Sequence, residues 1–312
     1  MRCALLAVAL AACGDRADVQ HPGGAGPEGA PLSLAADAQM IAIRGGDFIC
    51  GSTPEEREQA YDDHEHTSGS DTARREHWFD GEDDHHVVHL APFAIDLLPV
   101  TEGQYAEFVA AGGAPAPRID EAAWRAQGFP QDYASVVARD VWPRGQAPLG
   151  RAEHPVTLVT WQEAAAYCVW RGRLTGQKRR LPTEHEYEKA SRGSEGLWYP
   201  WGNLFDAGKL DSAVKGSGDT VVVGQYPDGA SAFGVLELAG NVAEWTSSRD
   251  ASGGVIVKGS SFDDWAGAGR GAARHSRKPD VRHIAIGFRC ATDTVPAGTP
   301  TGDEEDGDTI GS

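Results

Sequence analysis

The chain has 312 residues, of which 46 are acidic and 28 are Lys or Arg, so its formal net charge at pH 7 is -18. With 40% hydrophobic residues it can bury one large core or two modest ones. The acidic balance and the absence of a long basic run exclude nucleic acid as an expected partner.

The N-terminal stretch MRCALLAVALAACGD has the pattern of an export signal. Arg2 gives it a positive start, residues 4–12 are small and apolar, and Leu10-Ala11-Ala12-Cys13 resembles the bacterial lipobox, where cleavage leaves a lipid-modified cysteine. We therefore predict a lipoprotein signal peptide over residues 1–12 and a lipid on Cys13; an ordinary secretory signal is the alternative. Such a protein would lie in the cell envelope, facing the periplasm or the cell surface.

The remaining chain divides by composition into three parts. Residues 13–38 are rich in Gly, Ala and Pro and predict a flexible linker, and residues 294–312 predict an acidic disordered tail. A folded domain is expected over residues 39–293. No other apolar run approaches the roughly 20 residues of a membrane-spanning helix, so the lipid would be the membrane attachment.

Three helices are predicted by one shared pattern, a threonine followed three places later by Glu or Gln and a glycine at the far end. The threonine hydroxyl can accept an N-terminal backbone N–H while the Glu or Gln reaches back, and the glycine permits a left-handed stop. The predicted helices cover residues 101–112, 160–172 and 183–193.

Short β-prone segments complete the prediction of a loop-dominated α+β domain. In the second helix Trp161, Ala165, Cys168 and Val169 share one face, which we expect to be buried. Three thiols in the folded part, Cys50, Cys168 and Cys290, suggest one disulfide and one free cysteine in an oxidising compartment. The predicted strands are residues 41–44, 93–96, 156–160, 220–223, 255–258 and 285–290.

Seven sequence blocks occur in the order typical of one family. The chain resembles the formylglycine-generating enzymes, or sulfatase-modifying factors, over roughly residues 40–293, which implies their loop-rich, C-type-lectin-like fold. Cys50 replaces a methionine that is usual in the family, so we expect it to be buried. The blocks are IRGGDFICGS, HHVVHLAPFAIDLLPVTEGQYAEF, HPVTLVTWQEAAAYCVWRG, RLPTEHEYEKASRG, YPWGN, FGVLELAGNVAEW and GFRCA.

The resemblance implies a disulfide and structural calcium. Cys168 and Cys290 match positions that pair in relatives. The Gly-Asn corner at 240–241 can turn carbonyls toward one point, and two acids flank it, a hard-oxygen set of the kind that Ca²⁺ prefers. The implied ligands are the side chains of Glu237 and Glu244, the carbonyls of Gly240 and Val242 and, in a second site, Asp211.

Two features put that calcium site in question. Relatives usually carry Asn or Asp where this chain has Glu237, so the extra methylene would shift the carboxylate. The alternative for this segment is an acid-bearing turn packed by Trp245.

The family's oxidase chemistry needs two further cysteines that hold copper, and the matching segment, residues 258–280, contains none. We therefore expect no copper and no formylglycine formation. The functional hypothesis is an envelope binding or accessory module for a protein, peptide or glycan. The alternative is a nonheme-metal oxidase or another protein-modifying enzyme using Asp263, Asp264 and Arg274. The candidate cleft residues are Asp263, Asp264, Ser260, Ser261, Arg270, Arg274 and His275.

Residues 61–89 concentrate six histidines among acids. This composition suits Zn²⁺ or Cu²⁺, but the spacing matches no closed site. A solvated insertion with incidental metal affinity is the favoured interpretation.

Overall fold

The computed structural model describes residues 39–127 and 132–295. The predicted signal peptide, the lipidated Cys13, the linker up to residue 38 and almost all of the predicted tail lie outside these residues. Within the described ranges no helix is long and apolar enough to cross a membrane.

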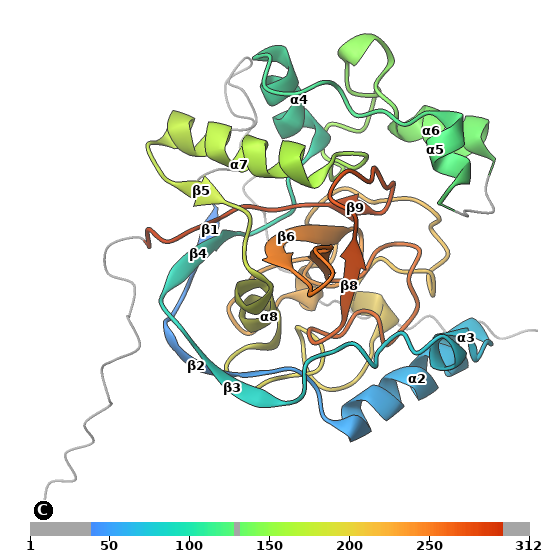
Figure 1. Cartoon of the computed structure of the whole chain (residues 1–312), viewed down its shortest axis with the longest axis vertical. Coiled ribbons are helices and arrows are strands. Elements are labelled where there is room, and N and C mark those ends of the chain that lie inside the picture. Colours follow the sequence, from blue (N-terminus) through green and yellow to red (C-terminus); the bar gives the residue numbers. More distant parts are fainter. Residues whose placement is uncertain (1–38, 128–131, 296–312) are drawn as a thin grey trace, which may run out of the picture. The chain divides into compact units, whose positions relative to one another are not determined.

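Short helices and strands alternate along the described chain, with long loops between them (Figure 1). The helices are α2 (Pro54–Ser68), α3 (Thr72–Arg75), α4 (Glu102–Ala110), α5 (Glu121–Arg125), α6 (Tyr133–Asp140), α7 (Trp161–Thr175) and α8 (Glu184–Arg192). The strands are β1 (Met40–Ile43), β2 (Gly46–Cys50), β3 (His86–Leu90), β4 (Phe93–Asp96), β5 (Arg179–Arg180), β6 (Ala243–Arg249), β7 (Val255–Lys258), β8 (Arg274–Arg277), β9 (Ile286–Gly287) and β10 (Ala291–Thr292).

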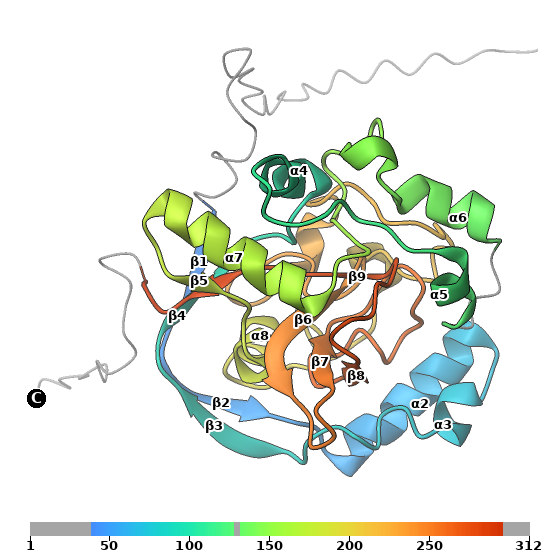
Figure 2. The ribbon, with the colours of Figure 1, turned by 45° about the horizontal axis from the view of Figure 1, so that its top comes forward.

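The strands form three small sheets. Their orders are β1-β4-β10-β5, β2-β3 and β8-β7-β6-β9, and the β6–β9 pair is parallel. Helix α8 contacts β2, β6 and β7, so it links two of the sheets. Figure 2 shows α8 near the middle of the domain, with α2 and α3 together at one side. The fold is the loop-rich α+β arrangement expected from the sequence.

The three predicted helices are present, each with its capping box. Thr101, Thr160 and Thr183 accept the N–H three residues on, and the side chain at that position accepts the N–H of the threonine. The predicted end of α7 is wrong, because the helix continues to Thr175 and stops at Gly176, which has φ 70°. Gly172 lies inside the helix, where a Cβ would come within 2.4 Å of the Gln177 carbonyl oxygen.

The strand predictions succeed in part. The predicted 93–96 and 255–258 are β4 and β7, and 41–44 and 285–290 overlap β1 and β9. The predicted strands 156–160 and 220–223 are loops. Leu158 has φ 57°, which breaks an extended strand, and Val221 pairs with the side chain of Asn241 instead of with a strand.

The His-rich segment is solvated, with five of its six histidines exposed, but it is also folded, which the sequence interpretation did not include. Its first part continues helix α2, which buries Glu56, Tyr61 and His64, and it also contains α3. Helix α2 has only a small hydrophobic face, so its apolar residues do not show the helical periodicity by which a helix is predicted from sequence.

Buried ion pairs fasten α2 to the domain. Arg192 and Arg270 both contact Glu56, and Arg270 also contacts Glu82. Glu188 of α8 accepts from Arg192 and from Lys258. All six side chains in these contacts are at most 3% exposed, so each charge needs its partner.

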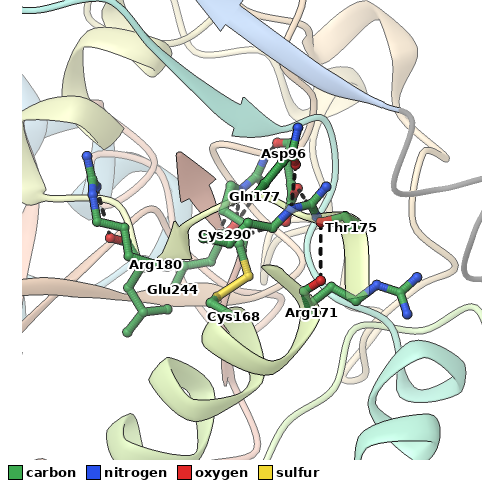
Figure 3. Close-up of a disulfide and its surroundings, with 11 residues drawn as sticks. Asp96, Cys168, Arg171, Thr175, Gln177, Arg180, Glu244 and Cys290 are labelled. Atoms are coloured by element: carbon green, nitrogen blue, oxygen red, sulfur yellow. Dashed lines mark hydrogen bonds and ion pairs between the residues drawn. A yellow bond between two sulfur atoms is a disulfide. The ribbon is translucent and has the colours of Figure 1, made fainter. Parts of the chain in front are cut away.

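Helix α7 is covalently linked to the C-terminal part of the domain. Cys168 and Cys290 form the disulfide that the family resemblance implied, with Cα atoms 5.6 Å apart (Figure 3). Cys50 is the free cysteine among the described residues and is buried, as expected. The buried face of α7 differs slightly from our prediction, because Cys168 is fully buried whereas Val169 is 46% exposed.

Candidate functional site

A pocket of about 400 Å³ opens beside the sheet β8-β7-β6-β9. It brings together four of the seven residues that the sequence proposed for the cleft, namely Ser261, Asp263, Asp264 and His275. Its remaining lining comes from Trp78, Ala243, Val257, Arg277, His283, Ala285 and Ile286.

The acidic pair of the pocket lies in the turn that follows β7. The backbone N–H and the hydroxyl of Ser261 donate to Asp264 Oδ2 at 2.8 and 2.7 Å, which fixes the Asp264 carboxylate. Loss of hydration and the neighbouring Asp264 carboxylate raise the pKa of Asp263. Among the described residues neither aspartate forms an ion pair. The pocket therefore holds two carboxylates without a direct salt bridge, with Arg277 as the basic residue of its lining.

Two histidines face the same pocket. Burial lowers the pKa of His275, which lies on β8, and lowers the pKa of His283 to about 4. In both cases the negative charge of Asp264 raises the pKa of the histidine, but by less than burial lowers it. Both imidazoles are therefore neutral at pH 7 and do not supply the missing positive charge.

Trp78, Arg277 and His283 belong to the pocket but were missed by sequence reasoning. Trp78 lies in the loop after α3 and is 41% exposed. Its ring packs edge-on against the His64 ring, with the ring centroids 5.2 Å apart. Trp78 lies within the histidine-rich stretch, where a tryptophan could have been considered as a binding residue. Nothing in the sequence, however, indicates that this stretch meets β8.

The other three proposed cleft residues do not line this pocket. Ser260 is buried and accepts the Gly240 N–H, and Arg270 is buried between Glu56 and Glu82. Arg274 pairs with Asp83 and Glu184 on the neighbouring surface. These three side chains support the turn and the sheet around the pocket.

The predicted calcium donors near the Gly-Asn corner already have partners. Glu244 is fully buried, and Arg289 donates to both of its carboxylate oxygens at 2.7–3.0 Å. Arg289 also donates to the Glu237 carbonyl, and the Glu237 carboxylate accepts from Gly224 and Asn241. The Arg289 guanidinium thus occupies the position that a calcium ion would take beside Glu244. The Glu244 carboxylate therefore does not fit a calcium ion in this arrangement.

The segment around Asp211 fits a calcium ion better. Asp211 is 1% exposed, and neither carboxylate oxygen accepts a hydrogen bond; the Ser212 hydroxyl also lacks a partner. Burial raises the pKa of Asp211 to about 6, against the charge of Lys215. The nearby Ser217 hydroxyl donates to the Asp219 carbonyl and not to the Asp211 carboxylate. This segment also touches the Gly-Asn corner, because Asn241 donates its N–H to the Asp211 carbonyl and a Cβ on Gly240 would lie 2.4 Å from that oxygen.

The two carbonyls predicted to bind calcium belong to Gly240 and Val242, at the Gly-Asn corner. Gly240 has φ 83° and Asn241 φ 64°, the positive values expected of a tight corner. Val242 follows immediately and is 1% exposed. The two carbonyls stay predicted calcium ligands, whereas the fourth predicted ligand, Glu244, is already paired with Arg289.

Comparisons with known proteins indicate the same family as the seven sequence blocks. A sequence profile of the sulfatase-modifying factor enzyme 1-like domain matches residues 30–294. The chain is similar to the inactive C-alpha-formylglycine-generating enzyme 2 of Mus musculus, 31% identical over 310 residues, covering 87% of this chain and 90% of that protein. It is 30% identical to the formylglycine-generating enzyme of Thermomonospora curvata over 323 residues, with 86% and 97% covered.

A solved structure shows the same fold. PvdO from Pseudomonas aeruginosa matches with a TM-score of 0.59 and 24% sequence identity, and the match covers 81% of this chain and 93% of that chain.

Proposed function

This chain belongs to the family of sulfatase-modifying factor enzyme 1-like domains, and on that basis we propose that it is a lipid-anchored binding module of the cell envelope that forms no formylglycine. The observation that carries the proposal is the chemistry of the pocket. Asp263 and Asp264 lie there and form no ion pair with a described residue, and none of the described cysteines lines the pocket. The similarity to a relative named as inactive supports the same conclusion.

The pocket suits a positively charged group of a peptide or protein. Two unpaired carboxylates attract a cation, and the exposed Trp78 at the same pocket offers a ring face for an ammonium or guanidinium group. Arg277 is the one cation in the lining and weakens this attraction. We therefore expect a ligand with Lys or Arg flanked by apolar residues.

Binding of such peptides should depend on Asp264. The variant Asp264→Asn keeps an acceptor for Ser261 but removes the charge, and we expect it to weaken the binding of Arg-containing peptides by about ten- to a hundredfold, the effect of a charged hydrogen bond of about 1.5–3 kcal/mol. Isothermal titration with matched Arg and Gln peptides measures this. The exposed Glu195→Gln is the control and should bind like the unmodified protein.

Equal affinity of the Arg and Gln peptides, or an unchanged affinity of Asp264→Asn, would contradict the proposed binding role. The variant is expected to fold, because Asn can take over both hydrogen bonds from Ser261. A circular dichroism melt identical to that of Glu195→Gln verifies the fold.

The oxidase alternative lacks a supporting geometry in this pocket. Among the residues that the structure describes, one group of three His, Cys, Asp or Glu side chains brings its ligand atoms within 4.8 Å, and it lies elsewhere. The pocket histidines and Asp264 do not form such a group. We therefore propose binding as the function.

The anchor is proposed from the lipobox-like residues before Cys13, which lie outside the described residues. The pocket would then face the aqueous side of a membrane at the end of a linker of roughly 25 residues. Fractionation of cells tests this. The protein should be in the membrane fraction and Cys13→Ser in the soluble fraction; a membrane-bound Cys13→Ser protein would contradict the anchor.

Calcium is proposed at Asp211. The family commonly binds structural calcium, and here a buried carboxylate without a hydrogen bond would gain a counter-charge from the ion. Calcium should therefore raise the melting temperature, with a stabilisation of about 2.7 kcal/mol at a free calcium concentration one hundred times the Kd. The effect should disappear in Asp211→Asn and persist in Asp228→Asn, whose side chain is exposed. A calcium shift that survives in Asp211→Asn would place the ion elsewhere.

A further inference from the structure

A second cluster of metal-binding side chains lies apart from the pocket. Cys50, Asp83 and His185 each offer one ligand atom, and these atoms all lie within 4.8 Å of one another. The three residues come from different elements. Cys50 ends β2, Asp83 lies in the loop between α3 and β3, and His185 is in the first turn of α8.

From this cluster we propose a zinc site formed by Cys50 Sγ, a carboxylate oxygen of Asp83 and a ring nitrogen of His185. Thiolate, imidazole and carboxylate are the ligands that Zn²⁺ takes in proteins, and three of them with a water complete a tetrahedron. The thiolate and the carboxylate together also balance the charge of a divalent ion.

The distances are compatible with binding after a small closure. Metal–ligand bonds of about 2.0–2.3 Å in a tetrahedron place the ligand atoms about 3.4–3.6 Å apart. Cys50 is fixed in the interior, whereas Asp83 and His185 are partly exposed. The latter two side chains can therefore rotate toward the thiol, and the ion has a path from solvent.

The surroundings orient one of the two partly exposed ligands and leave the other free to turn. The backbone at Asp83 is fixed because Ser52 donates its N–H to the Asp83 carbonyl, and Arg274 donates to Asp83 Oδ1 at 2.7 Å. One carboxylate oxygen held from outside while the other faces the metal is the usual arrangement of a ligating carboxylate. His185 has no hydrogen bond or ion pair among the described residues, so its ring is available.

The neighbouring charges nearly cancel. Glu188 and Glu184 lie on the side of α8, and Lys258 and Arg274 pair with them at 2.8–3.0 Å. The field of these four groups neither repels nor replaces a divalent ion, so the ligands themselves decide the affinity. Burial, followed by Glu188, raises the pKa of Cys50 to about 12. An ion must therefore displace the thiol proton when it binds.

The site would clamp the His-rich segment to the domain. Asp83 belongs to the stretch that carries α2 and α3, whereas Cys50 and His185 belong to β2 and α8. The ion would thus act beside the buried Arg270 and Glu82 pair, which joins the same stretch to the domain.

Zinc and cobalt binding by the full chain tests the proposal. We expect one Zn²⁺ per chain by isothermal titration and, with Co²⁺, a sulfur-to-metal charge-transfer band in the near ultraviolet. Cys50→Ser should lose that band, and Cys50→Ser and His185→Gln should each weaken zinc binding by at least about tenfold. The Cys50→Ser comparison also separates this thiol from Cys3 and Cys13, which the full chain contains.

His66→Gln is the matched control, since His66 is an exposed histidine of the same His-rich segment. It should bind zinc like the unmodified chain. The proposal would be overturned if the unmodified chain bound no stoichiometric zinc, if the cobalt band persisted in Cys50→Ser, or if His66→Gln lost as much affinity as His185→Gln. His185 is partly exposed, so His185→Gln keeps the test valid should Cys50→Ser fail to fold.

Discussion

Replacing both cysteines of the disulfide, in the variant Cys168→Ala/Cys290→Ala, should lower the free energy of unfolding by about 2–5 kcal/mol. The bond closes a sequence separation of 122 residues and joins α7 to the segment before β10. Without it the unfolded chain gains the conformations that the crosslink forbids, and two buried sulfurs lose their bond. Denaturant unfolding followed by tryptophan fluorescence measures the change.

A reductant provides the internal control for this prediction. It should lower the stability of the unmodified protein by a similar amount and leave the double variant unchanged. If the reductant had no effect on the unmodified protein, or if mass spectrometry found both thiols free after purification, the bond between Cys168 and Cys290 would be contradicted.

Arg289→Met should cost about 3–5 kcal/mol of stability, because it leaves a buried carboxylate without its partner. Both Arg289 and Glu244 have 0% exposed side chains, and the guanidinium donates to both carboxylate oxygens. It also holds the carbonyls of Asp96, Leu97 and Glu237. Thermal and urea unfolding of the variant measure the loss.

The matched surface variant is Arg125→Met. Arg125 pairs with Glu121 four residues earlier, but the two side chains are 72% and 53% exposed, so its loss should cost less than about 1 kcal/mol. The Arg289 variant also distinguishes the two accounts of Glu244. If calcium were the partner of Glu244, Arg289→Met would remain stable in calcium and lose stability on chelation. We expect the loss with and without chelator.

Local signals in the sequence predicted part of the fold well. The three capping boxes depend on residues three positions apart, and α4, α7 and α8 begin where Thr101, Thr160 and Thr183 indicate. The disulfide followed from matching family blocks. Helix α2 was missed because its buried residues include the polar Glu56 and His64. Glu56 becomes favourable in the interior through Arg192 and Arg270, which are distant in the sequence, and His64 packs edge-on against Trp78.

The candidate site, like the fold, was predictable from the sequence only in part. Asp263 and Asp264 lie in the turn that follows β7, five and six residues after its end, and the motif order placed them in the cleft. Arg270 was assigned to the same cleft because it is close in sequence, but its partners Glu56 and Glu82 lie 214 and 188 residues earlier and draw it into the interior. Trp78 reaches the pocket from a similar distance, so its role depends on a tertiary contact that no local pattern encodes.

We propose that this domain binds a ligand and forms no formylglycine. The most direct test incubates the purified full chain with copper, oxygen and a sulfatase-type Cys-x-Pro-x-Arg peptide, and measures aldehyde by mass spectrometry. We expect no formylglycine above a no-protein control, because the segment from Ser260 to Lys278 offers no thiolate to hold Cu(I). Aldehyde formation by the unmodified protein, abolished in Asp264→Ala, would contradict the binding role and assign an oxidase reaction to this pocket.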